Sequence, residues 1–333
     1  MKALRRIGIT LGDVNGIGPE VALKAVYGAR GPAGVQLVLV GSAGSVRRQA
    51  RALKLPVPPP WEPAPGKHPT PRVATWDPDP HHAPKPRPGK IEGDAARAAA
   101  AWIRAAAGAC LDGRLDAMVT APISKEGFHK AGINVPGHTE MLAELTGTKR
   151  FAMMLFGGPL HVTLVTRHVP IARVASDLTR AKVLETIRIT GEALPWLGLR
   201  GRRIAVCGLN PHAGDGGKIG REEIRFIAPA IRAARKEGFD AVGPVPADAV
   251  FYHALRGRYD AVVAMYHDQG LGPLKMLAFD CGVNVTLGLP IVRTSPDHGT
   301  AFDIAGRGKA NPSSMAIAVQ WAIRLAGRRN PWV

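Results

Sequence analysis

The chain has 333 residues, of which 46% are hydrophobic and 21% charged, so it can bury a sizeable core, and we expect two domains or lobes. Only 5% of the residues are aromatic, which argues against nucleic-acid binding by base stacking, and no apolar run approaches the ~18 residues of a membrane span. The formal net charge of +18 suits nucleic acid, an anionic membrane or a phosphorylated substrate. Because the basic residues are dispersed, we expect most of this charge to be solvated surface, with a few residues binding anions.

The three cysteines, Cys110, Cys207 and Cys281, are too far apart in sequence for a CxxC metal pair and give no disulfide framework. A reducing compartment suits them best. The first residues lead directly into a strand and lack the long apolar core of a signal peptide. We therefore expect a cytoplasmic protein.

The first expected strand, residues 7–11, leads into a glycine turn at residues 12–20 and then a helix to Tyr27. The glycine spacing of this turn is not GxGxxG, and the second strand, residues 35–40, is not followed by an acidic residue. The turn therefore does not predict a Rossmann nucleotide site, although it can present backbone N–H groups to an anion.

Residues 56–90 are rich in proline, and we expect a surface excursion without regular elements. Strands and helices alternate along the rest of the chain, which predicts an α/β fold with mainly parallel sheets. The expected strands lie at residues 116–120, 151–155, 161–166, 203–207, 260–264 and 283–287. The expected helices lie at residues 90–110, 180–194, from about 221, 247–255 and 313–325.

Four histidines follow apolar strands beside glycine or proline: His168, His212, His267 and His298. Parallel strands place their C-terminal ends along one rim, where such side chains can converge. Three imidazoles with open positions form a catalytic divalent-metal site, most simply for Zn²⁺. We expect the first three to be ligands and His298 to be a hydrogen-bonding group behind them. Because no HExxH motif fixes the site, simple loop capping by these histidines remains the alternative.

Residues 265–275, read as a glycine-rich turn, bring Asp268 and Lys275 close in sequence to His267. Other turns repeat the pattern of polar groups beside glycine, with PGHTE around His138 and CGLNPHAGDGG around His212. The longest motif, GVNVTLGLPIVRTSPDHGTAFDIAGRGKA, occupies residues 282–310. With YHDQG and GDVNGIGPE, these motifs resemble the 4-hydroxythreonine-4-phosphate dehydrogenase family of vitamin B6 biosynthesis over essentially the whole chain.

The resemblance implies NAD- or NADP-dependent oxidation of 4-phosphooxy-L-threonine to 2-amino-3-oxo-4-phosphooxybutanoate, which decarboxylates to 3-amino-2-oxopropyl phosphate. It implies two α/β/α lobes with mainly parallel sheets and a cleft between them, as in isocitrate and isopropylmalate dehydrogenases. We place the first lobe at residues 1–130 plus 291–333 and the second at 131–290. It further implies a homodimer whose active site is shared across the interface, with one divalent ion (Zn, Mg or Co) in each site.

The same resemblance assigns metal binding to His168, His212 and His267. It matches five residues to substrate binding: His138, Thr139, Lys275, Asn284 and Arg293. Lys275 and Arg293 are cations suited to the substrate phosphate. Asp268 and Asp248 are the acid–base candidates, with a purely structural role left open for each. Asp297, His298 and Thr300 are assigned to the cofactor.

The chain departs from the family pattern at two turns. Val14-Asn15 stands where Pro-Ala is common, and Ser124 stands where Asn is common. These changes leave room for a paralogue acting on D-threonate or D-erythronate 4-phosphate. Lys275 and Arg293 argue mildly against an unphosphorylated cis-diol dicarboxylate. A metal-dependent transferase on the same scaffold is a further alternative, whereas few aromatics and dispersed charge disfavour a nucleic-acid binder.

Overall fold

The computed structural model describes residues 4–28, 33–62, 71–199 and 201–333. Its contacts divide the chain into two compact units, the first made of Met1–Lys149 with Leu289–Val333 and the second of Arg150–Gly288. The first boundary falls after residue 149 and not after residue 130, because helix α5 (His138–Leu145) packs on helix α3 (Gly93–Leu111) of the first unit.

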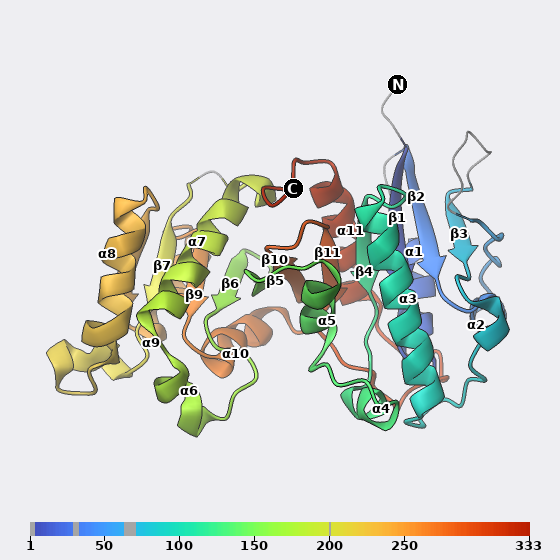
Figure 1. Ribbon diagram of the computed structural model, residues 1–333, viewed down its shortest axis with the longest axis horizontal. Helices are drawn as coiled ribbons and strands as arrows, with labels where there is room; N and C mark the ends of the chain where they lie inside the picture. Colours follow the sequence, from blue (N-terminus) through green and yellow to red (C-terminus); the bar gives the residue numbers. More distant parts are fainter. Residues whose placement is uncertain (1–3, 29–32, 63–70, 200) are drawn as a thin grey trace. The chain divides into compact units, whose positions relative to one another are not determined.

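The first unit is built on parallel strands in the order β3-β2-β1-β4-β11. Helix α3 covers one face of these strands, and α1 and α11 cover the other (Figure 1). Alanine-rich sequence lets α3 lie close to the sheet, with ten of its residues buried. The strands are β1 (Arg5–Thr10), β2 (Val35–Val40), β3 (Val73–Trp76), β4 (Ala117–Thr120) and β11 (Arg293–Pro296). The other helices are α1 (Gly18–Gly28), α2 (Ala43–Ala52), α4 (Lys125–Lys130) and α11 (Ser313–Ala326).

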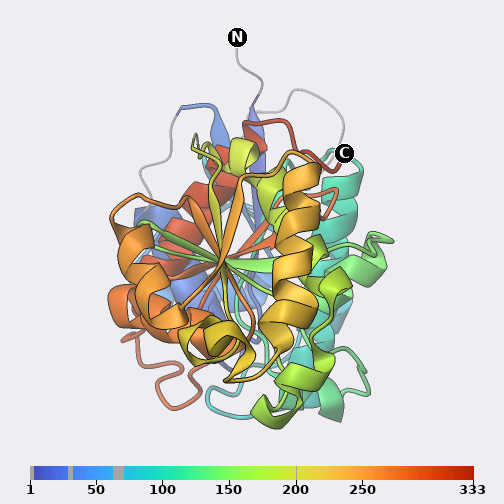
Figure 2. The ribbon, with the colours of Figure 1, turned by 90° about the vertical axis from the view of Figure 1, so that its left-hand side faces the viewer.

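The second unit has the strand order β10-β5-β6-β9-β7-β8, in which β5 runs antiparallel to both neighbours and β6, β9, β7 and β8 are parallel. Figure 2 shows α7 and α8 on one face of these strands and α9 and α10 on the other. The strands are β5 (Ala152–Gly157), β6 (Leu160–Leu164), β7 (Ile204–Cys207), β8 (Ala241–Val245), β9 (Ala261–Ala264) and β10 (Val283–Leu287). The helices are α6 (Ile171–Asp177), α7 (Arg180–Leu197), α8 (Ala228–Lys236), α9 (Ala247–Leu255) and α10 (His267–Ala278). The predicted α/β class with mainly parallel strands is confirmed.

The glycine-rich stretch at residues 265–275 is helical and not a turn, since it forms most of α10. Gly270 lies against β6 and β9, where an added Cβ would stand 2.7 Å from Val162 Cγ1 and 3.0 Å from Ala264 Cβ. Glycine at this position allows the helix to approach the sheet closely. The prediction of a turn here was therefore wrong.

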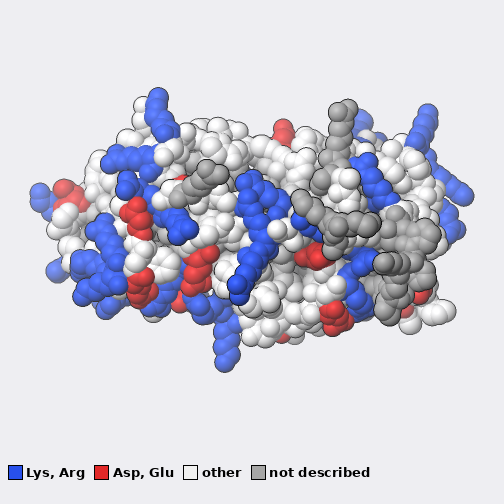
Figure 3. Space-filling model, turned by 90° about the horizontal axis from the view of Figure 1, so that it is seen from above, with Lys and Arg blue, Asp and Glu red and all other residues white. Residues whose placement is uncertain are grey.

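The proline-rich segment also contains more regular structure than expected. Strand β3 and a 3-10 turn, Pro80–His82, both lie within residues 56–90, while residues 63–70 fall outside the described part of the chain. No helix among the described residues is long and apolar enough to cross a membrane. Lys and Arg side chains are spread over the face shown in Figure 3, with acidic side chains among them.

Candidate active site

The three histidines predicted as ligands follow three neighbouring parallel strands. In the second unit β6, β9 and β7 are adjacent in that order. His168 comes shortly after β6, His267 begins α10 directly after β9, and His212 follows β7. The C-terminal ends of parallel strands lie on one edge of a sheet, and this is where ligands bind in open α/β sheets.

His168 and His267 lie close together in one chain, with ring centroids 5.7 Å apart. They line a hollow of about 220 Å³ with Arg167, Tyr266 and Asp268. The His267 Nδ1 atom lies 2.7 Å from Asp268 Oδ1. A carboxylate at Nδ1 favours a proton on that nitrogen and leaves Nε2 as a lone-pair donor, the arrangement common among metal-binding histidines. This pair therefore fits a divalent ion that prefers nitrogen ligands.

His212 does not join this pair within one chain. It lies exposed in the turn Pro211–Gly217, where its φ of 53° is left-handed. Among the described residues, no three His, Cys, Asp or Glu side chains gather as a metal-binding group. One chain thus brings two of the three predicted ligands together.

Gln269, which sequence reasoning missed, connects two of these strand ends. Its Oε1 accepts a hydrogen bond from Met265 N at 2.7 Å, and its Nε2 donates to Gly208 O at 2.7 Å. The side chain is 8% exposed. It therefore ties the end of β9 to the end of β7. The sequence does contain a signal for this role, because Gln269 in YHDQG follows an apolar strand closely.

In the first unit, Arg293 begins β11 with its guanidinium buried. The residue is 2% exposed, and burial lowers the pKa of its side chain to about 9. Its Nε and Nη2 atoms donate to Thr120 Oγ1 at 3.1 and 2.7 Å. Thr120 ends the neighbouring strand β4 and was not singled out from the sequence, because nothing local marks a partner 173 residues away.

His138 lies within the electrostatic influence of this arginine. Burial and then the charge of Arg293 lower the pKa of His138 well below its ordinary value, against a hydrogen bond with the backbone of Ala121. The imidazole is therefore neutral at neutral pH. Its Nε2 atom is closed to solvent and has no hydrogen-bond partner among the described residues. The first unit therefore places the charged Arg293 guanidinium near His138, whose Nε2 atom makes no hydrogen bond within the described residues.

The remaining candidates are distributed over several elements. Thr139 is buried in the first turn of α5, whose N-cap is Gly137, so capping by Thr139 is not its role. Lys275 lies on α10, and Asp248 is exposed in the first turn of α9. Asn284 lies on β10, and its buried Oδ1 has no partner among the described residues.

The proposed cofactor residues follow β11 in the first unit. Asp297 N donates to Ser314 Oγ at 3.1 Å, and His298 Nδ1 lies 3.0 Å from Gly299 O. The backbone O of Thr300 accepts a hydrogen bond from Ile17 N at 2.9 Å, which holds this segment against the glycine turn before α1. The structure therefore brings these residues beside the first glycine turn.

Comparisons with known proteins agree with the motifs. The sequence profile of the family described as "Pyridoxal phosphate biosynthetic protein PdxA" matches residues 34–322. A 4-hydroxythreonine-4-phosphate dehydrogenase of Geobacter metallireducens is 48% identical over 332 residues, covering 96% of this chain and 95% of the relative. A D-threonate 4-phosphate dehydrogenase of Pectobacterium atrosepticum is 42% identical over 327 residues, covering 96% and 99%. The crystal structure of the Klebsiella pneumoniae 4-hydroxythreonine-4-phosphate dehydrogenase has a TM-score of 0.84 and 42% identity, covering 98% and 99%. The chain therefore belongs to the PdxA family of dehydrogenases, oxidoreductases that act on a CH–OH group.

Proposed function

We propose that this dehydrogenase oxidises 4-phosphooxy-L-threonine with NAD⁺ or NADP⁺. The carbon bearing the hydroxyl loses a hydride to the cofactor and the hydroxyl loses its proton, which gives 2-amino-3-oxo-4-phosphooxybutanoate. This β-keto acid then loses CO₂ to give 3-amino-2-oxopropyl phosphate. The relative with 48% identity carries the corresponding name, which supports this substrate.

Three free cysteines are consistent with a reducing compartment, and we assign the reaction to the cytoplasm.

The observation that carries the proposal is the buried cation Arg293. Burial lowers the pKa of this guanidinium although the charge of Glu140 acts in the opposite direction, and a bound anion would further offset the lost solvation. At a pKa of about 9 it is still charged at neutral pH. Its planar fork suits phosphate oxygens, and Lys275 on α10 is the further cation that we assign to substrate binding. The free Nε2 of His138, in a neutral ring, can accept a hydrogen bond from a substrate hydroxyl or ammonium.

We assign His168, His212 and His267 as ligands of one divalent ion, on the strength of the close pair His168 and His267. Such an ion, when bound, lowers the pKa of a coordinated hydroxyl and polarises the ketone formed from it. Asp268 orients the ring of His267 through their hydrogen bond. Asp248 is the second carboxylate that we consider for proton transfer. Thr139 and Asn284 complete the substrate contacts, and Asp297, His298 and Thr300 contact the cofactor.

We further propose a homodimer in which partner chains complete each site. The metal-binding set is incomplete within the described part of one chain. Large apolar side chains are also exposed on α6 and at the C-terminal end of α10, with Met276 at 90%, Phe279 at 78% and Ile171 at 71% exposed. Such side chains favour burial in an interface. Mixing inactive His212→Ala and His267→Ala subunits should then restore activity, because one of the two sites in a mixed dimer is intact. No recovery after proven subunit exchange would contradict the shared site.

D-threonate 4-phosphate is the second candidate substrate. Two relatives of that name are 42% identical over nearly the whole chain. The two candidates share the phosphate and differ in having an amino or a hydroxyl group beside the carboxylate. Arg293 and Lys275 would serve both substrates.

The deciding experiment measures NADH or NADPH absorbance on mixing the purified protein with each phosphorylated substrate, before and after metal removal. Metal-dependent turnover of 4-phosphooxy-L-threonine that disappears in His267→Ala supports the first proposal. Turnover of D-threonate or D-erythronate 4-phosphate alone would show that one of these is the substrate, and the proposed site residues would stay the same. Failure with every substrate, both cofactors and restored metal would contradict the proposed reactions.

A further inference from the structure

The turn that carries His212 has an unusual backbone. Six consecutive residues, His212 to Gly217, have positive φ angles of 53°, 53°, 83°, 41°, 66° and 99°. Three of these residues, His212, Ala213 and Asp215, are not glycine. L-residues avoid this region because Cβ comes too close to the following carbonyl oxygen, and they occupy it routinely only as single residues. A left-handed turn of this length therefore needs strong support from its surroundings.

The support comes from the buried carboxylate of Glu223, which is 3% exposed. Glu223 Oε1 accepts hydrogen bonds from the backbone N–H groups of Leu209 and Asn210 at 2.8 and 2.7 Å. Glu223 Oε2 accepts from Asn210 Nδ2 at 3.0 Å. These bonds fix the two residues through which the chain passes from β7 into the left-handed turn. The glutamate itself begins a π-helical turn, Glu223–Ile227, that leads into α8.

The turn also packs directly on this carboxylate. A Cβ added to Gly214 would stand 2.6 Å from Glu223 Oε2, and one added to Gly208 would stand 3.2 Å from Glu223 Oε1. By contrast, a Cβ added to Gly216 would meet no atom within 4 Å, although its φ is also positive at 66°. The carboxylate is thus enclosed by the strand end on one side and the turn on the other.

We propose that Glu223 is a positioning residue for His212: it holds the left-handed turn so that the imidazole is set for metal binding before the ion arrives. The inference rests on the proposed function, which makes His212 a ligand. Unfavourable backbone conformations persist at sites where the surrounding structure determines them, and they are concentrated at functional sites. Without the carboxylate the turn relaxes to other backbone conformations. The free energy of metal binding must then also cover the cost of ordering His212. Loss of a group that orients a ligand typically weakens metal binding about 10–100-fold.

The test measures the Zn²⁺ affinity of the metal-free full-length protein by competition with a chromophoric chelator, together with the visible spectrum of the Co²⁺-loaded protein. Glu223→Ala should weaken Zn²⁺ binding about 10–100-fold and change the Co²⁺ spectrum. Glu223→Gln should recover part of the affinity, because its amide oxygen can still accept the two backbone hydrogen bonds.

Two glycine variants form a matched pair. Gly214→Ala and Gly216→Ala both place a side chain at positive φ, but only the former displaces Glu223. Gly214→Ala should therefore weaken Zn²⁺ binding more than Gly216→Ala. This comparison remains informative if Glu223→Ala fails to fold, and thermal unfolding of each metal-free variant shows whether it does.

His212→Ala separates this inference from the proposed function. If that variant binds Zn²⁺ as tightly as the unmodified chain, His212 is not a ligand and the proposed metal site is wrong. If His212→Ala weakens binding while folded Glu223→Ala or Gly214→Ala leaves affinity and spectrum unchanged, the proposed ligand remains and the positioning role of Glu223 is overturned.

Discussion

The guanidinium of Arg293 donates two hydrogen bonds to one hydroxyl, Thr120 Oγ1, from Nε at 3.1 Å and Nη2 at 2.7 Å. Both residues are buried, and they lie on the adjacent parallel strands β11 and β4. The hydroxyl accepts both bonds, so its own proton remains available to a further acceptor. Thr120 thus fixes the direction in which Arg293 presents its charge.

Thr120→Val should reduce kcat/KM for the phosphorylated substrate about 10–100-fold, since hydrogen bonds to a charged group contribute about 1.5–3 kcal/mol. Thr120→Ser keeps the hydroxyl and should recover most of the activity. Thr294→Val is a matched control, because Thr294 is also buried, on β11 next to Arg293, but its hydroxyl donates to Ala318 O at 2.8 Å. Steady-state kinetics check the prediction, and equal losses in Thr120→Val and Thr294→Val would contradict it.

Some strands and helices could be predicted from the sequence and others could not, for physical reasons. Residues 35–40 form β2 as expected, because an apolar run buried on both faces is visible in the sequence itself. Strand β11, with the sequence RTSP, was missed because its residues are buried through tertiary contacts that composition does not reveal. The α10 glycine, Gly270, was misread because close helix–sheet packing and turn formation select the same residue.

The candidate site shows the same division. The proximity of His168 and His267 could be predicted because each follows an apolar strand, and the structure brings their rings together. Their role as metal ligands stays a prediction. The hydrogen bonds of Thr120 and Glu223 could not be predicted, because their partners are supplied by the fold and no local motif in the sequence indicates them.

Asp13 should make stability depend on pH. Burial is the largest cause that raises the pKa of its carboxyl, from 3.8 to about 6, and its Oδ2 has no partner among the described residues. The folded chain therefore holds this proton more tightly than the unfolded chain. The stability gained by protonation is present below pH 3.8 and is lost as pH rises through about 6.

Asp13→Asn should accordingly increase the free energy of unfolding above pH 6 by on the order of 2–3 kcal/mol, and the difference should vanish towards pH 4. Urea unfolding midpoints from pH 4 to 8 measure it. Asp280→Asn, at an exposed position, controls for the loss of one negative charge. Parallel pH curves for Asp13→Asn and the unmodified chain would contradict the prediction.

Gln269→Leu should destabilise the second unit by about 2–5 kcal/mol, because it leaves the buried Met265 N–H and Gly208 C=O without their partner. Gln36→Leu is a matched control: Gln36 is 1% exposed but makes one such bond, to Pro71 O at 3.1 Å. Denaturant unfolding should show the larger loss in Gln269→Leu. A smaller loss there than in Gln36→Leu would argue against the bridge between β9 and β7.

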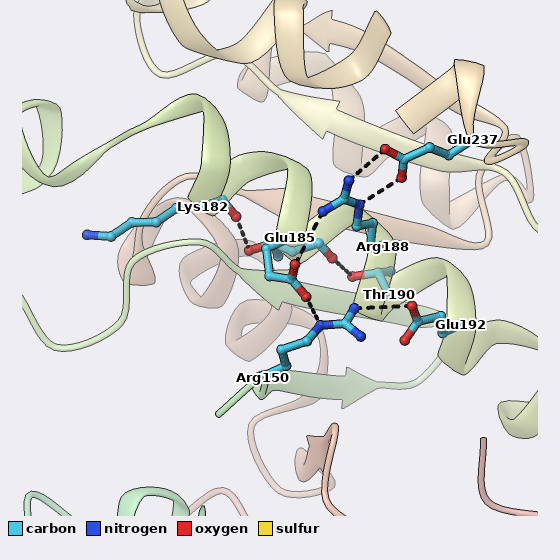
Figure 4. Close-up of polar contacts among 8 residues, drawn as sticks. Arg150, Lys182, Glu185, Arg188, Thr190, Glu192 and Glu237 are labelled. Carbon is cyan, nitrogen blue, oxygen red and sulfur yellow. Dashed lines mark hydrogen bonds and ion pairs between the residues drawn. The ribbon is translucent and has the colours of Figure 1, made fainter. Parts of the chain in front are cut away.

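The ion-pair network of α7 should contribute only a salt-sensitive stabilisation. Figure 4 shows Arg188 with both Glu185 and Glu237, and Arg150 with Glu185 and Glu192. The hydrogen bond from Arg188 lowers the pKa of Glu237, so its contribution is present above the ordinary glutamate range and is lost as pH falls through the lowered value. Arg188→Gln should lower the urea midpoint slightly in dilute buffer and leave it unchanged in 1 M salt, because exposed pairs are screened. A loss of equal size at both salt concentrations would contradict this.

Asn15, one of the departures from the family pattern, should hold the glycine turn to the end of the proline-rich segment. Its Nδ2 donates to Lys90 O at 2.9 Å, and its Oδ1 accepts from Arg87 N at 2.6 Å. Asn15→Ala removes these two bonds and a third, from Nδ2 to Glu92 Oε2 at 3.3 Å, but keeps the bond from Gly89 N to the backbone O of residue 15. Stability should fall by about 1–3 kcal/mol. Hydrogen exchange should quicken at the amide of Arg87 more than at that of Gly89, because only the former loses its acceptor. Equal acceleration at both amides would indicate that the whole segment detaches, and that the side chain of Asn15 does not hold it locally.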